Sequence, residues 1–245
     1  TRVLVVYGTR PECIKLAPVI RELRGAPGRF DVVVCSTAQH RNLVEDVEEV
    51  FDLQPDHDLD LMRPGQTLNE LTARALFGLH PLLGSVDPSW VLVQRDTTSA
   101  MAASLAAFHS GYRVAHIEAG LRTSDLRSPF PEEANRRIID LLADLHFPPT
   151  ASAARALERE GVDPNKIFVS GNTCVDAVHW LCESSLSTPP GREILVTIHR
   201  RESFGRPLAS ILVAIEQLST SFPELDWILP VHPNPNIATR VTKAL

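Results

Sequence analysis

Short apolar runs alternate along the chain with longer segments in which apolar residues recur at helical spacing. Runs at 2–7, 30–36 and 90–94 predict buried strands, and those at 112–119 and 166–171 predict two more. The helical spacing predicts helices over 14–24, 40–52, 67–86, 98–110 and 132–145. Strands that alternate with helices in this way predict an α/β fold built on a parallel sheet with both faces covered.

The pattern divides the chain near residue 170. Residues 1–170 are expected to form a Rossmann-like domain, and residues 171–245 are expected to begin a second α/β domain. In that second part the pattern predicts helices over 172–186 and 208–222 and strands over 194–200 and 227–233. Only nine residues follow Asn236, so we expect the second domain to be incomplete in this chain.

Composition narrows the class of protein. The chain has 245 residues, 44% of them hydrophobic, which suits one large or two medium soluble domains. A net charge of -6 argues against a nucleic-acid partner, and no apolar run approaches the roughly 20 residues of a membrane span. The N-terminus lacks a signal-peptide profile, and the four cysteines lack paired spacing. We therefore expect a cytoplasmic protein with free thiols.

Several familiar cofactor motifs are absent or incomplete. The segment at 56–60, DHDLD, resembles the start of a calcium loop, but Leu61 and Thr67 stand where such a loop needs Gly and Glu. The HIE at 116–118 lacks the P-C-x-x-C of a zinc deaminase. GxGxxG, the P-loop and GxSxG do not occur. No metal and no cofactor is therefore expected.

Polar residues follow several predicted strands. Arg10 and Lys15 follow the first strand, Asp96 follows the strand at 90–94, and Glu118 ends the strand at 112–119. Because the carboxyl ends of parallel strands meet at one edge of a sheet, these side chains are expected to share a crevice. Taken alone, Asp96 could instead cap a helix and Arg10 could be a surface residue of a turn.

Two further groups extend this set. Glu132 and Arg136 lie at a predicted helix start, and His199 and Arg200 lie at the end of the strand predicted over 194–200. Histidine and arginine facing carboxylates suit proton transfer beside a phosphorylated leaving group. Each residue also has a structural interpretation, since a single histidine is more often part of a core than of a site.

Long motifs of the chain resemble the non-hydrolysing UDP-N-acetylglucosamine 2-epimerases. They include GTRPECIKLAPVI, HIEAGLRTSDLRSPFPEEANRR, GVDPNKIFVSGNT and VTIHRRESFG, and the resemblance covers essentially the whole chain. It implies two Rossmann-like domains in a glycosyltransferase-B arrangement, with the active site in the cleft. It also implies that UDP-N-acetylglucosamine and UDP-N-acetylmannosamine are interconverted by elimination and re-addition of UDP, with inversion at C2. A cytoplasmic homodimer serving polysaccharide biosynthesis is the corresponding expectation.

The resemblance implies a role for each candidate residue. The carboxylates match the family's catalytic acids, without a division into base and acid, and the second domain is the one that binds the nucleotide sugar. UDP-N-acetylglucosamine is expected as substrate and, in a neighbouring site, as allosteric activator. The implied catalytic residues are Asp96, Glu118, Glu132 and His199. The implied substrate-binding residues are Arg10, Lys15, Arg136 and Arg200, and the implied allosteric residues are Gln39, His40 and Gln66.

The chain departs from the family pattern at a few positions. Arg95 stands where glycine is common and Cys13 where alanine is common. A cation next to Asp96 is expected to lower the pKa of that carboxyl if the two side chains meet, which would weaken it as a base. The family's SGG-type turn and QEE helix start are not found in these 245 residues. A non-catalytic nucleotide-sugar-binding protein is therefore one alternative. A hydrolysing 2-epimerase is another, because the two reactions share the elimination step.

Overall fold

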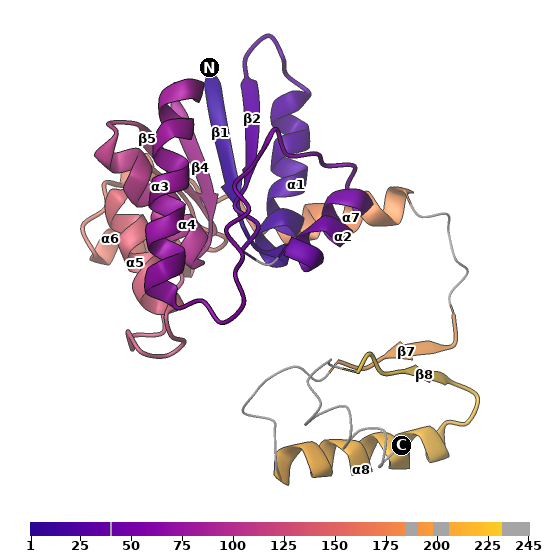
Figure 1. The fold of residues 1–245 in the computed structure, drawn as a ribbon. Helices are drawn as coiled ribbons and strands as arrows, with labels where there is room; N and C mark the ends of the chain where they lie inside the picture. Colours follow the sequence, from indigo (N-terminus) through magenta and orange to yellow (C-terminus); the bar gives the residue numbers. More distant parts are fainter. Residues whose placement is uncertain (40, 185–190, 198–205, 232–245) are drawn as a thin grey trace. The chain divides into compact units, whose positions relative to one another are not determined.

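The computed structural model describes residues 1–39, 41–184, 191–197 and 206–231 (Figure 1). The chain forms two compact units, Thr1–Ser184 and Ser185–Leu245. The first contains a six-stranded sheet and the second a two-stranded sheet.

The six-stranded sheet is the centre of the first unit. Its order is β3-β2-β1-β4-β5-β6, and every neighbouring pair is parallel. From β1 the strand order continues to β2 and β3 on one side and to β4, β5 and β6 on the other, so the order reverses between β1 and β4. At such a switch point the loops after the two strands separate and leave room for a ligand. The strands are β1 (Arg2–Tyr7), β2 (Asp31–Ser36), β3 (His57–Asp58), β4 (Trp90–Gln94), β5 (Arg113–Ile117) and β6 (Leu145–Phe147).

Strand β1 shows why the sheet is buried on both sides. Val3, Val5 and Tyr7 belong to one core cluster, whereas Leu4 and Val6 belong to the other. Successive side chains of a strand point to opposite faces, so both faces of β1 contact apolar neighbours. A strand buried in this way reads as a continuous apolar run, which is the pattern that predicted it.

Helices cover both faces of this sheet (Figure 1). Helices α1, α2 and α7 contribute to the cluster that contains Val5, and α3, α4 and α5 contribute to the cluster that contains Leu4. Threonine side chains cap α3, α4 and α6 by accepting a hydrogen bond from a backbone amide of the first turn. The helices are α1 (Arg10–Arg24), α2 (Arg41–Val50), α3 (Leu68–Val86), α4 (Thr98–His109), α5 (Glu132–Leu142), α6 (Ala151–Arg159) and α7 (Thr173–Ser184).

The secondary-structure prediction was wrong around β6 and α6, neither of which it included. Helix α5 ends at Leu142, and β6 begins soon after within the segment predicted as helix. The strand predicted over 166–171 is only an isolated bridge between Ile167 and His146. A three-residue strand has too few positions to show a period, so its pairing with β5 becomes visible only in the folded sheet.

The first unit extends beyond the boundary predicted near residue 170. Helix α7, expected to open the second domain, packs on the first unit through Ala177 and Trp180. The Trp180 ring meets Phe51 edge-on with centroids 5.1 Å apart, and the Arg21 guanidinium lies 4.2 Å from the Trp180 ring centroid. These contacts explain why the compact unit ends at Ser184.

The second unit is a small α/β assembly. Strand β7 (Glu193–Leu195) pairs in parallel with β8 (Asp226–Ile228), and α8 (Arg206–Ser221) contributes its core. That core consists of Leu208, Leu212 and Ile215, with four partly buried apolar neighbours. The predicted strands at 194–200 and 227–233 are therefore present, but shorter than expected among the described residues.

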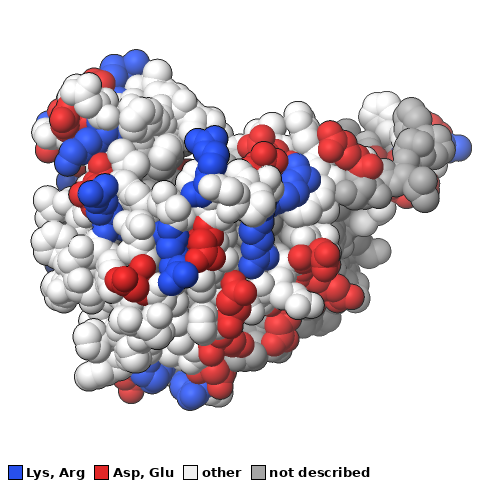
Figure 2. Space-filling model, turned by 90° about the horizontal axis from the view of Figure 1, so that it is seen from above, with Lys and Arg blue, Asp and Glu red and all other residues white. Residues whose placement is uncertain are grey.

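Charges of both signs alternate on the surface that Figure 2 shows from above. In the first unit, Arg2 pairs with Asp31 at 2.6 Å and Arg24 pairs with Asp56 at 3.2 Å. Across the described ranges, no helix combines the length and apolar character required to cross a membrane.

Candidate active site

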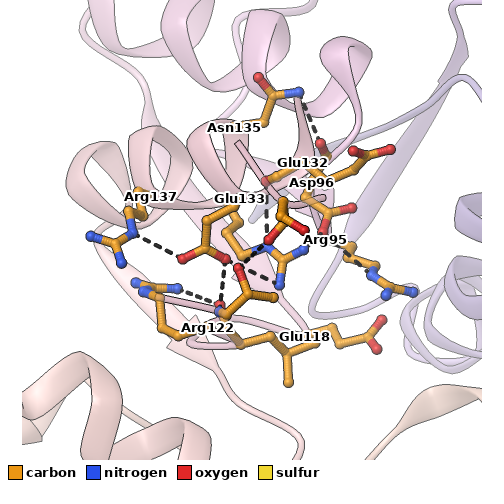
Figure 3. A network of polar contacts seen from close by, with 12 residues as sticks. Arg95, Asp96, Glu118, Arg122, Glu132, Glu133, Asn135 and Arg137 are labelled. Carbon is orange, nitrogen blue, oxygen red and sulfur yellow. Dashed lines mark hydrogen bonds and ion pairs between the residues drawn. The ribbon is translucent and has the colours of Figure 1, made fainter. Parts of the chain in front are cut away.

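The predicted site residues of the first unit gather at the carboxyl edge of the sheet. Arg10 begins the helix after β1, Asp96 follows β4, and Glu118 follows β5. Strand β4 lies between β1 and β5, so these three turns are neighbours. Glu132 begins α5, and Figure 3 shows it beside Asp96. The expectation that separate loops bring carboxylates to one edge of the sheet therefore agrees with this arrangement.

Left-handed backbone conformations turn the chain sharply at two of these strand ends. Arg95 has φ +62° and Glu118 has φ +63°, a region that costs a non-glycine residue on the order of 1 kcal/mol. At Gly120, where φ is +79°, the space is too small for any side chain, because a Cβ there would lie 2.4 Å from the Ala153 carbonyl oxygen. The strain thus falls on residues next to or within the candidate site.

Asp96 is a buried carboxylate with two cationic neighbours. Its Oδ2 lies 2.6 Å from Arg136 and 3.5 Å from Arg95, and its backbone carbonyl accepts a hydrogen bond from Asn135. Burial raises the pKa of Asp96, and the nearby charge of Glu132 acts in the same direction, although Arg136 and Arg95 oppose both. The predicted Arg95–Asp96 contact is present, and Arg95 lowers the pKa of Asp96 as expected, but burial outweighs this effect and the net shift of the pKa is upward.

Glu132 supplies the least restrained carboxylate of the group. It is half-buried as the first residue of α5, and its Oε2 is buried without a hydrogen-bond partner among the described residues. A carboxylate near a helix N-terminus lies in the positive field of the helix dipole. One oxygen of Glu132 is therefore available to a ligand or to a transferred proton.

Glu118 is held in place from three directions. Its Oε2 receives a hydrogen bond from the Lys15 ammonium at 2.5 Å and another from the Gln94 amide. Its Oε1 lies 3.5 Å from Asn172. Glu118 and Lys15 are both nearly buried, and a buried pair of this kind is costly to break by removing one partner. Lys15 thus fixes the carboxylate of Glu118 in this structure.

Glu12 fills the position at the start of α1 where an external anion could otherwise bind. Its carboxylate accepts hydrogen bonds from the backbone amides of Gly8 and Thr9, at 3.1 and 2.8 Å, and from the Thr9 hydroxyl. Helix N-terminal amides often bind phosphate, but these two are already satisfied by the chain itself. Burial raises the pKa of Glu12 to about 7, against the effect of these hydrogen bonds and of one from Thr97.

Thr97 connects this first turn to the segment that carries Asp96. Its hydroxyl donates to Glu12 at 2.7 Å and accepts a hydrogen bond from the Ala100 amide, which caps α4. The N-termini of α1 and α4 are therefore joined by one buried carboxylate. Since Thr97 directly follows Asp96, the contact also restricts the position of Asp96.

Glu133 organises the segment before α5. It is fully buried, and its carboxylate lies 3.0 Å from Arg137 and 3.6 Å from Arg136. It also accepts a hydrogen bond from the Thr123 amide at 3.1 Å. Figure 3 shows the ion pair between Glu133 and Arg137. Of the two adjacent glutamates, Glu133 is thus the structural one, while Glu132 keeps an unpaired oxygen.

The predicted substrate-binding cations occupy different environments. Arg10 is exposed at the start of α1, whereas Lys15 and Arg136 are buried against Glu118 and Asp96. His199 and Arg200 lie outside the described residues.

Two of the three predicted allosteric residues lie in the part of the chain that the structure describes, and they have different partners. Gln39 accepts a hydrogen bond from Ser99 at 2.8 Å, and Gln66 accepts one from Arg74 of α3. His40 lies outside the described residues.

Sequence reasoning missed the residues that support the carboxylates. Gln94 and Asn172 contact Glu118, and Glu12 joins two helix starts. A signal for Glu12 was available, because Thr9 with Glu at the third helical position is a capping-box pattern. No local pattern marks Gln94 or Asn172, since their partner lies on another segment.

Comparison with known proteins identifies a family for this chain. The family model described as UDP-N-acetylglucosamine 2-epimerase matches residues 21–245. The UDP-N-acetylglucosamine 2-epimerase of Yersinia pestis is 46% identical over an alignment that covers 100% of this chain and 69% of that protein.

Solved structures give the same result. A putative UDP-N-acetylglucosamine 2-epimerase from Listeria monocytogenes has a TM-score of 0.91 at 40% identity, covering 100% of this chain and 66% of that one. The UDP-GlcNAc 2-epimerase from Neisseria meningitidis bound to UDP-GlcNAc has a TM-score of 0.86 at 39% identity, covering 100% of this chain and 70% of that one. The chain thus spans about two thirds of the length of these relatives, and its second domain is incomplete relative to theirs.

We predict that Glu12→Gln changes how stability depends on pH. A carboxyl group whose folded pKa is raised from 4.5 to about 7 makes the fold less stable as pH rises through that window. The free energy of unfolding of Glu12→Gln relative to wild type should therefore increase by ~3 kcal/mol between pH 5 and pH 8. Denaturant unfolding at both pH values measures this difference.

Glu70→Gln is the matched control, because Glu70 forms the same capping box with Thr67 on the surface. The pKa of Glu70 is lowered by hydrogen bonds from Thr67, so its carboxylate is ionised throughout that pH range. A pH-independent difference for Glu12→Gln, like the one expected for Glu70→Gln, would contradict the prediction.

We predict that Arg95→Gly is more stable than Arg95→Ala by about 1 kcal/mol, because only glycine adopts φ +62° without strain. Both variants lose the same ion pair with Asp96, so their difference isolates the backbone. Thermal unfolding of the two proteins provides the measurement. Equal stability would show that the left-handed conformation at Arg95 carries no strain.

Proposed function

The chain belongs to the UDP-N-acetylglucosamine 2-epimerase family. We propose on this basis that the full-length protein interconverts UDP-N-acetylglucosamine and UDP-N-acetylmannosamine without net hydrolysis. The observation that carries the proposal is the group of three carboxylates, Asp96, Glu118 and Glu132, at one edge of the first sheet. Each has a different set of polar neighbours. Carboxyl groups in contrasting environments are suited to divide acid and base roles between them.

The chemistry of the epimerisation requires such groups. In the proposed reaction, a base removes the proton at C2, the C–H electrons form a C1=C2 double bond, and the C1–O bond to UDP breaks. The resulting 2-acetamidoglucal stays bound until UDP adds back to C1 and a proton is delivered to the opposite face of C2. Since the C2 proton is weakly acidic, its removal must be coupled to loss of UDP, and a proton donor and acceptor are needed on both faces of the sugar.

The contacts in the first unit support specific contributions to this reaction. Asp96, whose pKa is raised by burial, can accept and release a proton. Glu132 has an unpaired buried oxygen, and Glu118 is oriented by Lys15.

Positively charged side chains would stabilise the negative charge of the departing diphosphate. We propose that the exposed Arg10 contacts it directly and that His199 and Arg200 contribute from the second unit. Lys15 and Arg136 would act in part through the carboxylates that they contact in this structure. Activation by UDP-N-acetylglucosamine through Gln39, His40 and Gln66, a homodimer, a cytoplasmic location and a role in polysaccharide biosynthesis complete the proposal.

Incubation of the full-length protein with UDP-N-acetylglucosamine in deuterated water tests the function. UDP-N-acetylmannosamine that carries deuterium at C2 is the expected product, followed by NMR. Free N-acetylmannosamine with UDP would indicate the hydrolysing reaction. Unchanged substrate whose signals broaden on addition of protein would indicate a binding protein without turnover.

We predict that Asp96→Asn, Glu118→Gln and Glu132→Gln each lower kcat by roughly a hundredfold or more, as expected for loss of a proton-transfer group. Circular dichroism should show that the variants remain folded. Glu22→Gln serves as control, because Glu22 is an exposed carboxylate of α1 whose side chain is 79% accessible. Near-normal rates in all three site variants would remove the assignment.

A further inference from the structure

His116 is a fully buried histidine that lies beside the candidate site without belonging to it. It sits in β5, and its Nε2 lies 2.6 Å from the backbone carbonyl oxygen of Arg95. Its Nδ1 lies 2.6 Å from Oδ1 of Asp140 in α5. The ring therefore links the turn that carries Asp96 to a helix on one face of the sheet.

The partners of the ring indicate its protonation state. A carbonyl oxygen only accepts, so Nε2 must donate to Arg95. Burial opposes ionisation of Asp140, but His116 and Arg122 outweigh it and lower the pKa of Asp140. The other oxygen of Asp140 accepts hydrogen bonds from Arg122 at 2.8 Å and from the Gly120 amide at 3.2 Å, as a carboxylate does. Both ring nitrogens thus face acceptors, which is the hydrogen-bonding arrangement that suits an imidazolium ring.

This contact falls on the strained turn next to Asp96. Arg95 has φ +62°, and its carbonyl is the group that His116 binds. The next carbonyl, that of Asp96, accepts a hydrogen bond from Asn135 at 3.0 Å. Two successive peptide groups are thus fixed by buried donors from β5 and α5, which limits how far the Asp96 side chain can move.

We propose that His116 is a positioning residue, which fixes the turn at Arg95 and, as a buried cation, favours the ionised form of Asp96. This inference rests on the proposed function, in which Asp96 transfers a proton. It requires no contact between His116 and the substrate.

The charges around Asp96 and His116 determine how a substitution of His116 should change the pKa of Asp96. Asp96 faces the cations Arg95 and Arg136 and the acid Glu132, in addition to His116. His116 faces Asp140 and also His146, which stays neutral because burial lowers the pKa of His146. Burial raises the pKa of Asp96, and His116 is one of three cations that counteract this effect. Loss of the charge on His116 should therefore raise the pKa of Asp96 further.

Two substitutions separate the charge of His116 from its hydrogen bond. His116→Gln places a neutral side chain of similar volume in the cavity and disturbs both contacts. Asp140→Asn lets the ring become neutral while Nε2 still donates to the Arg95 carbonyl. Arg122→Gln is the control, because it removes another ionic partner of Asp140 and leaves His116 and its two contacts in place.

The primary measurement is the titration of the Asp96 carboxyl carbon by NMR in the full-length protein. We expect the pKa of Asp96 to rise by roughly half a unit or more in His116→Gln and Asp140→Asn, and to stay unchanged in Arg122→Gln. We also expect kcat and KM to respond differently, because a displaced Asp96 affects the chemical step and not the binding of substrate. His116→Gln should lower kcat by roughly tenfold or more with little change in KM, and Asp140→Asn should lower it less.

An unchanged Asp96 titration in the two folded variants would overturn the proposal, as would a loss of kcat without any shift of the pH profile. If His116→Gln does not fold, as judged by circular dichroism, the titration of Asp140→Asn decides the question. The titration does not depend on turnover. A wild-type protein that fails to epimerise its substrate would therefore contradict the proposed function and leave this test intact.

Discussion

The position of β1 between β2 and β4 is the constraint on which the site depends. Parallel pairing on both sides aligns the end of β1 with the end of β4, so the turn at Gly8 lies next to the turn at Asp96. The carboxylate of Glu12 then joins the two helix starts through Thr97. Because this link is buried and made of charge-assisted hydrogen bonds, a shift of either turn would leave polar groups unsatisfied.

The site consists of three carboxylates that have the same chemical group but different neighbours. Glu118 has a lysine partner, Asp96 has arginine partners, and Glu132 keeps one oxygen unpaired. Burying ionised groups costs free energy that hydrophobic packing would not. This cost falls on residues that the proposed reaction needs, where burial strengthens charge interactions and raises the pKa of Asp96.

Two of the residues with left-handed backbone conformations lie at the same place. Arg95 and Glu118 both adopt left-handed conformations at strand ends, and each is restrained by partners on other segments. Unfavourable conformations persist only when the surroundings over-determine them. The contact of His116 with the Arg95 carbonyl, supported by Asp140, is one such restraint. The fold thus stabilises a geometry that the local sequence would not adopt alone.

The sequence by itself determined the βα alternation and the strand ends where Asp96 and Glu118 lie, because apolar periodicity is a local property. It did not reveal β6 or α6, whose short segments acquire meaning only beside β5. The partners of the charged residues were also hidden, since Lys15 meets Glu118 and Arg136 meets Asp96 through the folding of distant segments. Only the tertiary structure decided the pKa of Asp96, because burial and the summed field of neighbouring charges are properties of the folded chain.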